Sequence, residues 1–469
     1  MTETARDLGV YAEQCSRIQT KLAQARAKDV DRKVFGASSH DYEIAPPATA
    51  QEIAEFERSA GIVLPDAYVA FLTMVGNGGG PDKPAAGPYY GIYALGRGAR
   101  ALYYDIEDGL ERPAALTPNL SDEAWADFVN TLESDEVDDD TYDQMVAEMC
   151  GGLITIGSQG CTYYHALVLN GPYRGRVVNV DEQHCEKPVF AFEENFLDWY
   201  ERWLDEILNG ILMQDGPSWF GRTMGGDEHH LIGVYRTTGL KTTKQSALDG
   251  FYKLTDLSDT GVNFLLNIFD CEPGQFRRTA AALLAKFAPD QAISPIADLL
   301  DGDADDLRTA CQSIWWYFKD DLNAWTARLL GQINDINDLQ TARYISYIFK
   351  DADGDFTGVF LAFARHPNDS IRLVGITSLR HVPLNEDIAQ MLLDAMTDEN
   401  WRIVNAALVG HELNRDPRFL YRYCELARTI DRERAELRVN LWRKTKALGY
   451  EDAADFVAAC ERGEFDLGS

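Results

Sequence analysis

The chain has 469 residues, of which 45% are hydrophobic and 25% are charged, so it can build packed cores and is expected to form more than one domain. Its 75 acidic and 44 basic residues give a net charge of -31, which repels nucleic-acid phosphates and anionic lipids and favours a basic protein partner. No apolar run reaches the roughly 18 residues of a membrane span and no leader pattern is present, so we expect a cytoplasmic protein with no membrane and no nucleic acid among its partners.

The N-terminal part of the chain is predicted to be helical. Residues 1–41 form one amphipathic helix in this interpretation, because their apolar residues recur with a period near 3.6. Thr49 and Glu52 have the spacing of a capping box, and Gly61 is well placed to end the helix that they start.

A second short helix is predicted to open at Leu64-Pro65-Asp66. Tyr68 lies on its apolar side and is expected to be half buried. The Gly76-Asn77-Gly78-Gly79-Gly80 run that follows lacks the Lys-Ser/Thr of a phosphate loop and the placement of a dinucleotide fingerprint, so we interpret it as a turn. Asn77 is expected to adopt the left-handed turn conformation.

A ligand groove, if the domain has one, is expected beside this turn. Loops carried on a rigid scaffold are the usual place for binding residues. We therefore place the candidate groove at 76–81, with Asn77 in the turn and Tyr89 and Tyr90 beside it.

The stretch 101–150 concentrates acidic residues and contains a single base, Arg112. Three interpretations stay open for it: a solvated helix or loop that aids solubility, a surface that steers a cationic protein, and, least favoured, a calcium loop. The calcium loop is disfavoured because the segment lacks the central Gly and closing Glu of an EF-hand. The candidate partner-binding acids are Asp135, Glu136, Asp138, Asp139 and Asp140.

Strand patterns follow the acidic stretch. Segments 90–95, 153–156, 163–169 and 176–180 are rich in β-branched and aromatic residues, and the turn residues at 170–175 predict a hairpin between the last two. An apolar-striped helix at 196–208, which includes Trp199, closes the region. We therefore expect an α+β domain at 42–210, with its helices packed on a mostly antiparallel sheet.

Beyond a Gly-rich linker predicted at 211–240, no convincing strand pattern returns. Five segments instead place an arginine early in an apolar helix, at intervals close to the length of a two-helix repeat. These arginines are Arg278, Arg308, Arg343, Arg372 and Arg402. The pattern resembles the short HEAT-like repeat, and the resemblance implies an all-α solenoid over 241–469.

A further resemblance rests on the helix at 53–60 and the elements after it. Gly61, the pair Leu64-Pro65, Tyr68, a Phe-Leu pair and then Asn77-Gly78-Gly79 resemble the SUKH superfamily, also called the Smi/Knr family, and the later strands and the helix around Trp199 are similar to the family's C-terminal part. The resemblance covers about 42–210 and implies a binding module. Members of that family include bacterial immunity proteins that neutralise toxins and a fungal regulator of cell-wall synthesis.

Two functions from different classes follow. The favoured hypothesis is a non-enzymatic immunity-type protein that neutralises a basic toxin through its acidic surface. The alternative is a scaffold or regulator of cell-envelope or other assembly, which would use the solenoid as its partner surface.

No enzyme, metal or cofactor pattern is convincing. The Asp227-Glu228-His229-His230 run lies in the Gly-rich stretch with no other histidine nearby. His165 is expected to be a core histidine, and the run 315–318 is expected to lie in the solenoid core, with an exposed partner surface as its alternative. The eight dispersed cysteines contain no C-x-x-C pair, which favours reduced, core-packed thiols.

Overall fold

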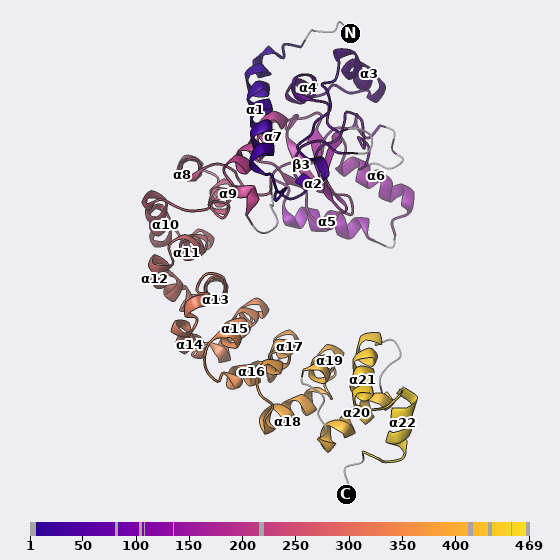
Figure 1. Ribbon diagram of the computed structural model, residues 1–469, viewed down its shortest axis with the longest axis vertical. Coiled ribbons are helices and arrows are strands. Elements are labelled where there is room, and N and C mark those ends of the chain that lie inside the picture. Colours follow the sequence, from indigo (N-terminus) through magenta and orange to yellow (C-terminus); the bar gives the residue numbers. More distant parts are fainter. Residues whose placement is uncertain are drawn as a thin grey trace. The chain divides into compact units, whose positions relative to one another are not determined.

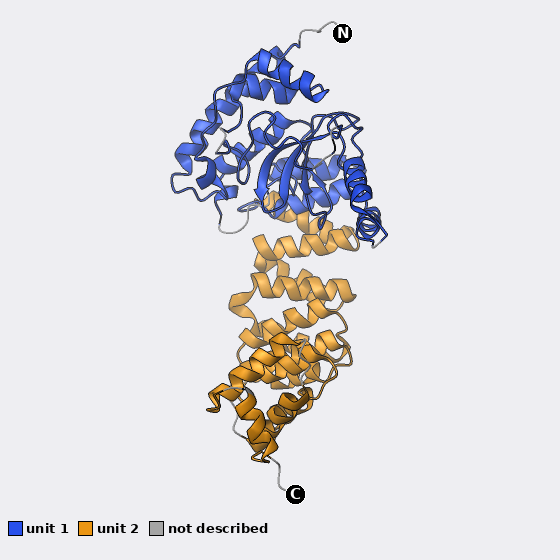
Figure 2. Cartoon of the chain, turned by 90° about the vertical axis from the view of Figure 1, so that its right-hand side faces the viewer, with its two compact units in different colours: residues 1–257 blue, residues 258–469 orange. Residues whose placement is uncertain are grey.

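The computed structural model divides the chain into two compact units, residues 1–257 and 258–469 (Figure 2). It describes residues 6–79, 83–102, 106, 108–134, 136–214, 220–410, 416–429, 434–451 and 453–465. None of the helices formed by these residues is long and apolar enough to span a lipid bilayer. The expected boundaries at 41/42, 210/211 and 240/241 stay predictions.

Unit 1 combines helices with one antiparallel sheet, and the predicted α+β class is confirmed. The strands follow the order β1-β2-β3-β4. They are β1 Leu153–Gly160, β2 Tyr163–Val168, β3 Val177–Asp181 and β4 Val189–Phe190. The helices are α1 Ala12–Lys28, α2 Ala37–His40, α3 Ala50–Ala60, α4 Asp66–Ala70, α5 Asp122–Leu132, α6 Asp139–Met149, α7 Phe196–Leu208, α8 Glu228–Thr237 and α9 Lys241–Phe251.

Local signals placed several of these elements correctly. Thr49 and Glu52 form the predicted capping box, and Gly61 ends α3 in the left-handed conformation. The predicted hairpin is present as β2 and β3, joined by a turn in which Gly171 and Gly175 have positive φ.

Two predicted elements differ from the structure. The single helix expected over 1–41 is wrong, because α1 ends at Lys28 and a separate turn of helix, α2, follows. The buried Asp29 carboxylate holds this break: it accepts hydrogen bonds from the backbone N–H of Lys33 and Val34 and from the hydroxyl of Tyr42. The strand expected over 90–95 contributes only isolated bridges, which Ile92 makes to Ala85 and to Gly157 of β1.

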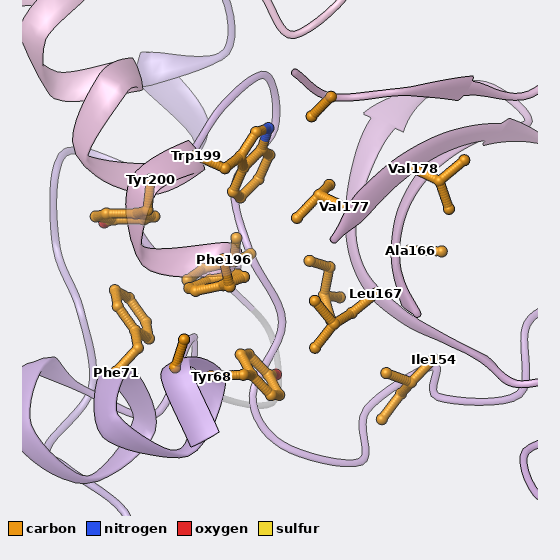
Figure 3. Packing of buried hydrophobic residues seen from close by; sticks show 14 of the residues in the cluster. Tyr68, Phe71, Ile154, Ala166, Leu167, Val177, Val178, Phe196, Trp199 and Tyr200 are labelled. Atoms are coloured by element: carbon orange, nitrogen blue, oxygen red, sulfur yellow. The ribbon is translucent and has the colours of Figure 1, made fainter. Parts of the chain in front are cut away.

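The core of unit 1 lies where α7 meets the sheet and α4 (Figure 3). Phe196, Trp199 and Tyr200 point from α7 toward Tyr68 and Phe71 on one side and toward the sheet on the other. The ring centroids of Tyr68 and Phe196 are 4.9 Å apart. Trp199 is fully buried. Tyr68 is also buried rather than half buried as predicted, because α7 covers the apolar side of α4.

Two buried histidines of unit 1 predict how stability changes with pH. Burial lowers the pKa of His40 and of His165 to about 4. In the unfolded chain each pKa is about 6.5, so the unfolded state binds more protons between pH 6.5 and 4, and the free energy of unfolding falls as pH falls through that window. Each histidine should account for roughly 3 kcal/mol of that loss.

Urea unfolding of wild type and of His165→Gln, measured at intervals from pH 7 to pH 4.5, checks this expectation. The variant should lose less stability than wild type over that interval, although it is less stable at pH 7. The same loss in both proteins would contradict it, because the carboxylates titrate in both.

Unit 2 is entirely helical over its described residues, as predicted for the C-terminal part (Figure 1). Its first helices are α10 Asp259–Cys271, α11 Gln275–Phe287, α12 Pro289–Leu300, α13 Ala304–Tyr317, α14 Asn323–Leu330, α15 Leu339–Asp351 and α16 Thr357–Ala364. The remaining ones are α17 Asp369–Ser378, α18 Glu386–Ala395, α19 Trp401–Val409, α20 Pro417–Thr429, α21 Ala435–Ala447 and α22 Ala453–Glu461.

Ion pairs join alternate helices of unit 2. Arg278 of α11 lies 3.2 Å from a carboxylate oxygen of Asp306 in α13, and Arg308 of α13 lies 3.7 Å from Asp338, which caps α15. Arg372 of α17 likewise lies 3.0 Å from Asp398, just before α19. Three of the five repeat arginines therefore pair with an acid that lies in, or just before, the second helix onward.

The cysteines do not all behave as predicted. Cys15, Cys150 and Cys311 are buried free thiols, as expected, but Cys161, Cys185 and Cys271 are exposed. Cys424 and Cys460 form a disulfide between α20 and α22. The two residues are 36 positions apart, and only the packing of these helices brings their Cα atoms to 5.6 Å.

Candidate functional site

The acidic segment, residues 121–149, contains α5 and α6 at the margin of unit 1 (Figure 1). Both helices start at a capping side chain: Ser121 accepts a hydrogen bond from the N–H of Ala124, and Asp138 accepts one from the N–H of Thr141. Acidic residues occupy the first turn of each helix, where a carboxylate offsets the helix dipole. Sequence-local chemistry thus explains why this charged stretch is helical.

The apolar sides of α5 and α6 hold the segment against the domain. Trp125, Leu132, Val146 and Ala147 are buried. The ring of His184, in the connection between β3 and β4, lies 6.3 Å from the ring of Trp125, 6.2 Å from that of Phe128 and 6.5 Å from that of Tyr142, measured between centroids. One imidazole therefore contacts both acidic helices, and burial lowers its pKa.

The predicted acidic site is exposed where the structure describes it. Glu136, Asp138, Asp139 and Asp140 are all exposed, and Asp135 lies outside the described residues. Further exposed acids that belong to the same segment, and that were not singled out from the sequence, are Asp122, Glu123, Asp127, Glu133 and Glu148.

Few cations neutralise this surface. Lys187 Nζ lies 2.5 Å from a carboxylate oxygen of Asp122. In the described part of the chain, no ion pair involves the acids from Glu133 to Glu148. Because acidic side chains stand on packed helices without counter-charges, their negative potential is available to a cationic surface.

Asp138 has a structural task besides its charge. Its carboxylate makes the capping hydrogen bond of 2.8 Å to the N–H of Thr141, and bonds to Thr141 lower its pKa. Replacing it would therefore remove a cap and weaken the start of α6. Asp139 and Asp140 make no such bond and are the better probes of charge alone.

The predicted groove at 76–81 is described only as far as Gly79, and this part of the turn contacts neighbouring backbone. Asn77 Oδ1 accepts a hydrogen bond from the N–H of Leu95, and Asn77 does not adopt the predicted left-handed conformation. Gly78 does, with φ 54°. A Cβ on Gly78 would lie 2.0 Å from the carbonyl oxygen of Tyr93, and one on Gly79 would lie 2.0 Å from that of Lys83, so both positions need glycine because backbone passes close by.

Tyr89 and Tyr90 belong to a separate aromatic cluster. The Phe35 ring lies 5.9 Å from that of Tyr89 and 5.4 Å from that of Tyr90. Tyr89 donates a hydrogen bond to the carbonyl of Phe220, and burial raises its pKa to about 12, whereas Tyr90 is 38% exposed. Among the described residues no hydrogen bond or ring contact joins Asn77 to either tyrosine, so the structure does not assemble the three into one site.

The Leu64-Pro65 element has a structural role. Leu64 is buried, its N–H donates to Glu57 Oε1, and its carbonyl accepts from Arg174 Nη2 at 2.8 Å. Pro65 occupies the position before α4. His165 is buried as predicted, with Nδ1 3.0 Å from Asn179 Oδ1. Asp227 caps α8 by accepting a hydrogen bond from the N–H of His230, so this carboxylate starts a helix within the predicted linker.

Sequence reasoning missed a cavity next to the acidic segment. It has a volume of about 1080 Å³ and is lined by the start of α5, by β4 and the loop after it, and by α8 and α9. Its wall carries side chains of both charge signs, among them the cations Arg176 and Lys187 and the carboxylate of Glu193. No local pattern predicts it, because its wall comes from segments more than a hundred residues apart in the chain.

Comparison with known proteins finds one family model that matches part of the chain. Residues 47–202 match the model of the SMI1 / KNR4 family (SUKH-1), which supports the resemblance that the helix and turn motifs indicated. That family is associated with immunity proteins of toxin systems, and its members typically bind protein partners. No curated protein matches the chain. A solved X-ray structure of YibA from E. coli, a structural genomics target, is 12% identical, with a TM-score of 0.33 over 51% of this chain and 93% of that one.

Proposed function

We propose that this chain is a non-enzymatic, immunity-type protein that neutralises a basic toxin inside the cell, and that the acidic segment of unit 1 is the recognition surface. The observation that carries this function is the set of exposed acids on α5 and α6, of which the described ones from Glu133 to Glu148 have no ion-pair partner, on helices anchored by Trp125 and His184. The SUKH match at 47–202 supports the immunity role.

The mechanism is occlusion of the toxin guided by charge. Long-range attraction between the acidic segment and a Lys/Arg-rich face raises the rate of encounter, and salt screens that attraction over about 10 Å. Once the surfaces meet, the carboxylates of Glu136, Asp139 and Asp140 pair with cationic side chains and cover the toxin's own site. No residue of this chain performs chemistry in that mechanism.

We also propose that unit 2 is a HEAT-like array. The links from Arg278 to Asp306, from Arg308 to Asp338 and from Arg372 to Asp398 support the proposal, because they repeat between consecutive helix pairs as a stacked repeat requires. Such an array offers an extended surface for a second partner.

Affinity purification from the native host with the full chain as bait, at low and at high salt, tests the proposed function. The expected result is one basic protein that is toxic when expressed alone, is tolerated when this chain is co-expressed, and is recovered less well at high salt. Recovery of only neutral or acidic assemblies would contradict the immunity role and favour a scaffold.

A further inference from the structure

The run 315–318, expected in the core of unit 2, instead contributes to an exposed aromatic surface. Trp316 is 49% exposed and Tyr347 is 42% exposed, while Trp315 and Tyr344 are half buried. We call these four residues of α13 and α15 the aromatic patch. Large side chains left exposed side by side are unusual on a soluble protein and mark an interaction surface.

The four rings form a connected cluster across two helices. The Trp315 and Tyr347 centroids are 5.3 Å apart, and those of Trp316 and Tyr344 are 6.3 Å apart. Tyr344 and Tyr347 are themselves 6.4 Å apart. Because the packing of α13 on α15 sets these distances, the patch is presented by rigid elements. Trp and Tyr are also the residues that most often carry binding energy at interfaces.

Basic side chains accompany the patch. Lys319 Nζ lies 5.2 Å from the centroid of the Trp315 ring. Arg343 and Lys350 are exposed and lie four residues before and three residues after Tyr347, which places all three on one side of α15.

These cations differ from the three arginines that link the helix pairs of the array. Arg278, Arg308 and Arg372 pair with acids of the next repeat. In the described part of unit 2, no ion pair involves Lys319, Arg343 or Lys350. In a chain of net charge -31, three exposed cations without a carboxylate partner beside exposed rings form a locally complementary surface for acidic groups.

We propose that the aromatic patch with Lys319, Arg343 and Lys350 binds an acidic peptide segment of a partner protein. The rings take up its apolar side chains, and the three cations pair with its carboxylates. This inference goes beyond the proposed function, since its ligand has the opposite charge to a basic toxin and its surface lies in unit 2.

An acidic peptide fits this surface better than a nucleic acid does. Nucleobases stack on exposed rings as well, but affinity for a strand comes from neutralising successive phosphates. Here Asp305 and Asp338 lie at the starts of the same two helices, and the net charge of the chain opposes a polyanion. Three cations next to apolar rings match a short segment that combines carboxylates with apolar anchors.

Peptide display tests the proposal, with the immobilised full chain as the target and a random library of short peptides as the probe. Peptides that also bind a Trp316→Ala/Tyr347→Ala double variant are first removed from the library. We expect the enriched peptides to carry net negative charge and at least one aromatic or large aliphatic residue. A synthetic peptide of the enriched sequence should bind the double variant about tenfold more weakly or worse, because truncation of central aromatic residues removes most binding energy. Lys319→Glu/Lys350→Glu should have a similar effect.

Matched variants separate the patch from general surface effects. Ile293→Ala removes a 53% exposed apolar side chain of α12, and Arg402→Glu reverses an exposed charge of α19, and neither should change peptide binding by more than about twofold. Absence of enrichment over the double variant, or enrichment of neutral or basic peptides, would overturn the proposal. Two further results would also overturn it. One is that the aromatic patch binds single-stranded oligodeoxythymidine and no peptide; the other is that the chain dimerises in sedimentation and the double variant does not.

Discussion

Reversing the charge of Asp139 and Asp140 to lysine is expected to slow association with the basic protein partner by about tenfold or more in low-salt buffer, because electrostatic steering raises encounter rates by about 10- to 1,000-fold. Both side chains are exposed, lie in the first turn of α6 and have no cationic partner among the described residues. Stopped-flow mixing with the recovered partner measures the effect. The rate for the variant should also depend less on salt.

The control variant must also lose two carboxylates from the first turns of helices, so that the two variants differ only in where the charge is reversed. Asp259 and Asp290 are likewise exposed acids in the first turns of α10 and α12, so Asp259→Lys/Asp290→Lys loses the same favourable interaction with the helix dipole. It should leave the association rate nearly unchanged. Equal slowing in both variants would mean that net charge, and not the acidic segment, sets the rate. Asp138 stays intact in this design because it caps α6.

Removing one carboxylate from a buried charge cluster in unit 1 is expected to cost about 3–5 kcal/mol of its free energy of unfolding. Arg202 lies 2.8 Å from Glu193 and 2.8 Å from Glu206, and Lys253 Nζ lies 3.0 Å from Glu206. The side chains of Arg202 and Glu206 are 9% and 5% exposed. Glu206→Gln keeps the shape but leaves Arg202 with one carboxylate and removes the carboxylate partner of the partly buried Lys253.

Hydrogen exchange of peptides from α7 and α9 measures this loss within unit 1 itself. Lys253→Met, added to Glu206→Gln, should recover part of the lost stability, since it removes the cation left without a partner. The control is Glu186→Gln, which breaks the more exposed pair of Glu186 with Arg222, and that change should cost less than about 1 kcal/mol. A loss as small as this in Glu206→Gln would contradict the expected role of the cluster.

The cluster also shows what the sequence could not predict about the chain's organisation. Lys253 follows α9, beyond the predicted linker at 211–240, yet its partner Glu206 belongs to α7. The two are 47 residues apart, and no local pattern connects them. For the same reason the cavity between β4 and helices α8 and α9 was not predictable.

The sequence by itself determined the features whose cause lies within a few residues. Thr49 and Glu52 cap α3, Gly61 ends it, and the acids of α5 and α6 stand at the helix starts that Ser121 and Asp138 define. The motifs at 53–79 indicated a resemblance to the SUKH family, whose model matches residues 47–202, and composition indicated a strong acidic surface. Each of these features depends on the types of residues and on their separation along the chain, and both can be read from the sequence.

Only the tertiary structure decided which side chains are buried, paired or exposed. Asp29 breaks the N-terminal helix because the Tyr42 hydroxyl reaches it, and Gly78 rather than Asn77 takes the left-handed conformation because the Tyr93 backbone passes there. Trp316 is exposed although its pattern resembled a core, since helical spacing gives the face of a helix but not what covers that face. The physical reason is common to all three: burial and pairing are set by residues that are distant in the chain and close only after folding.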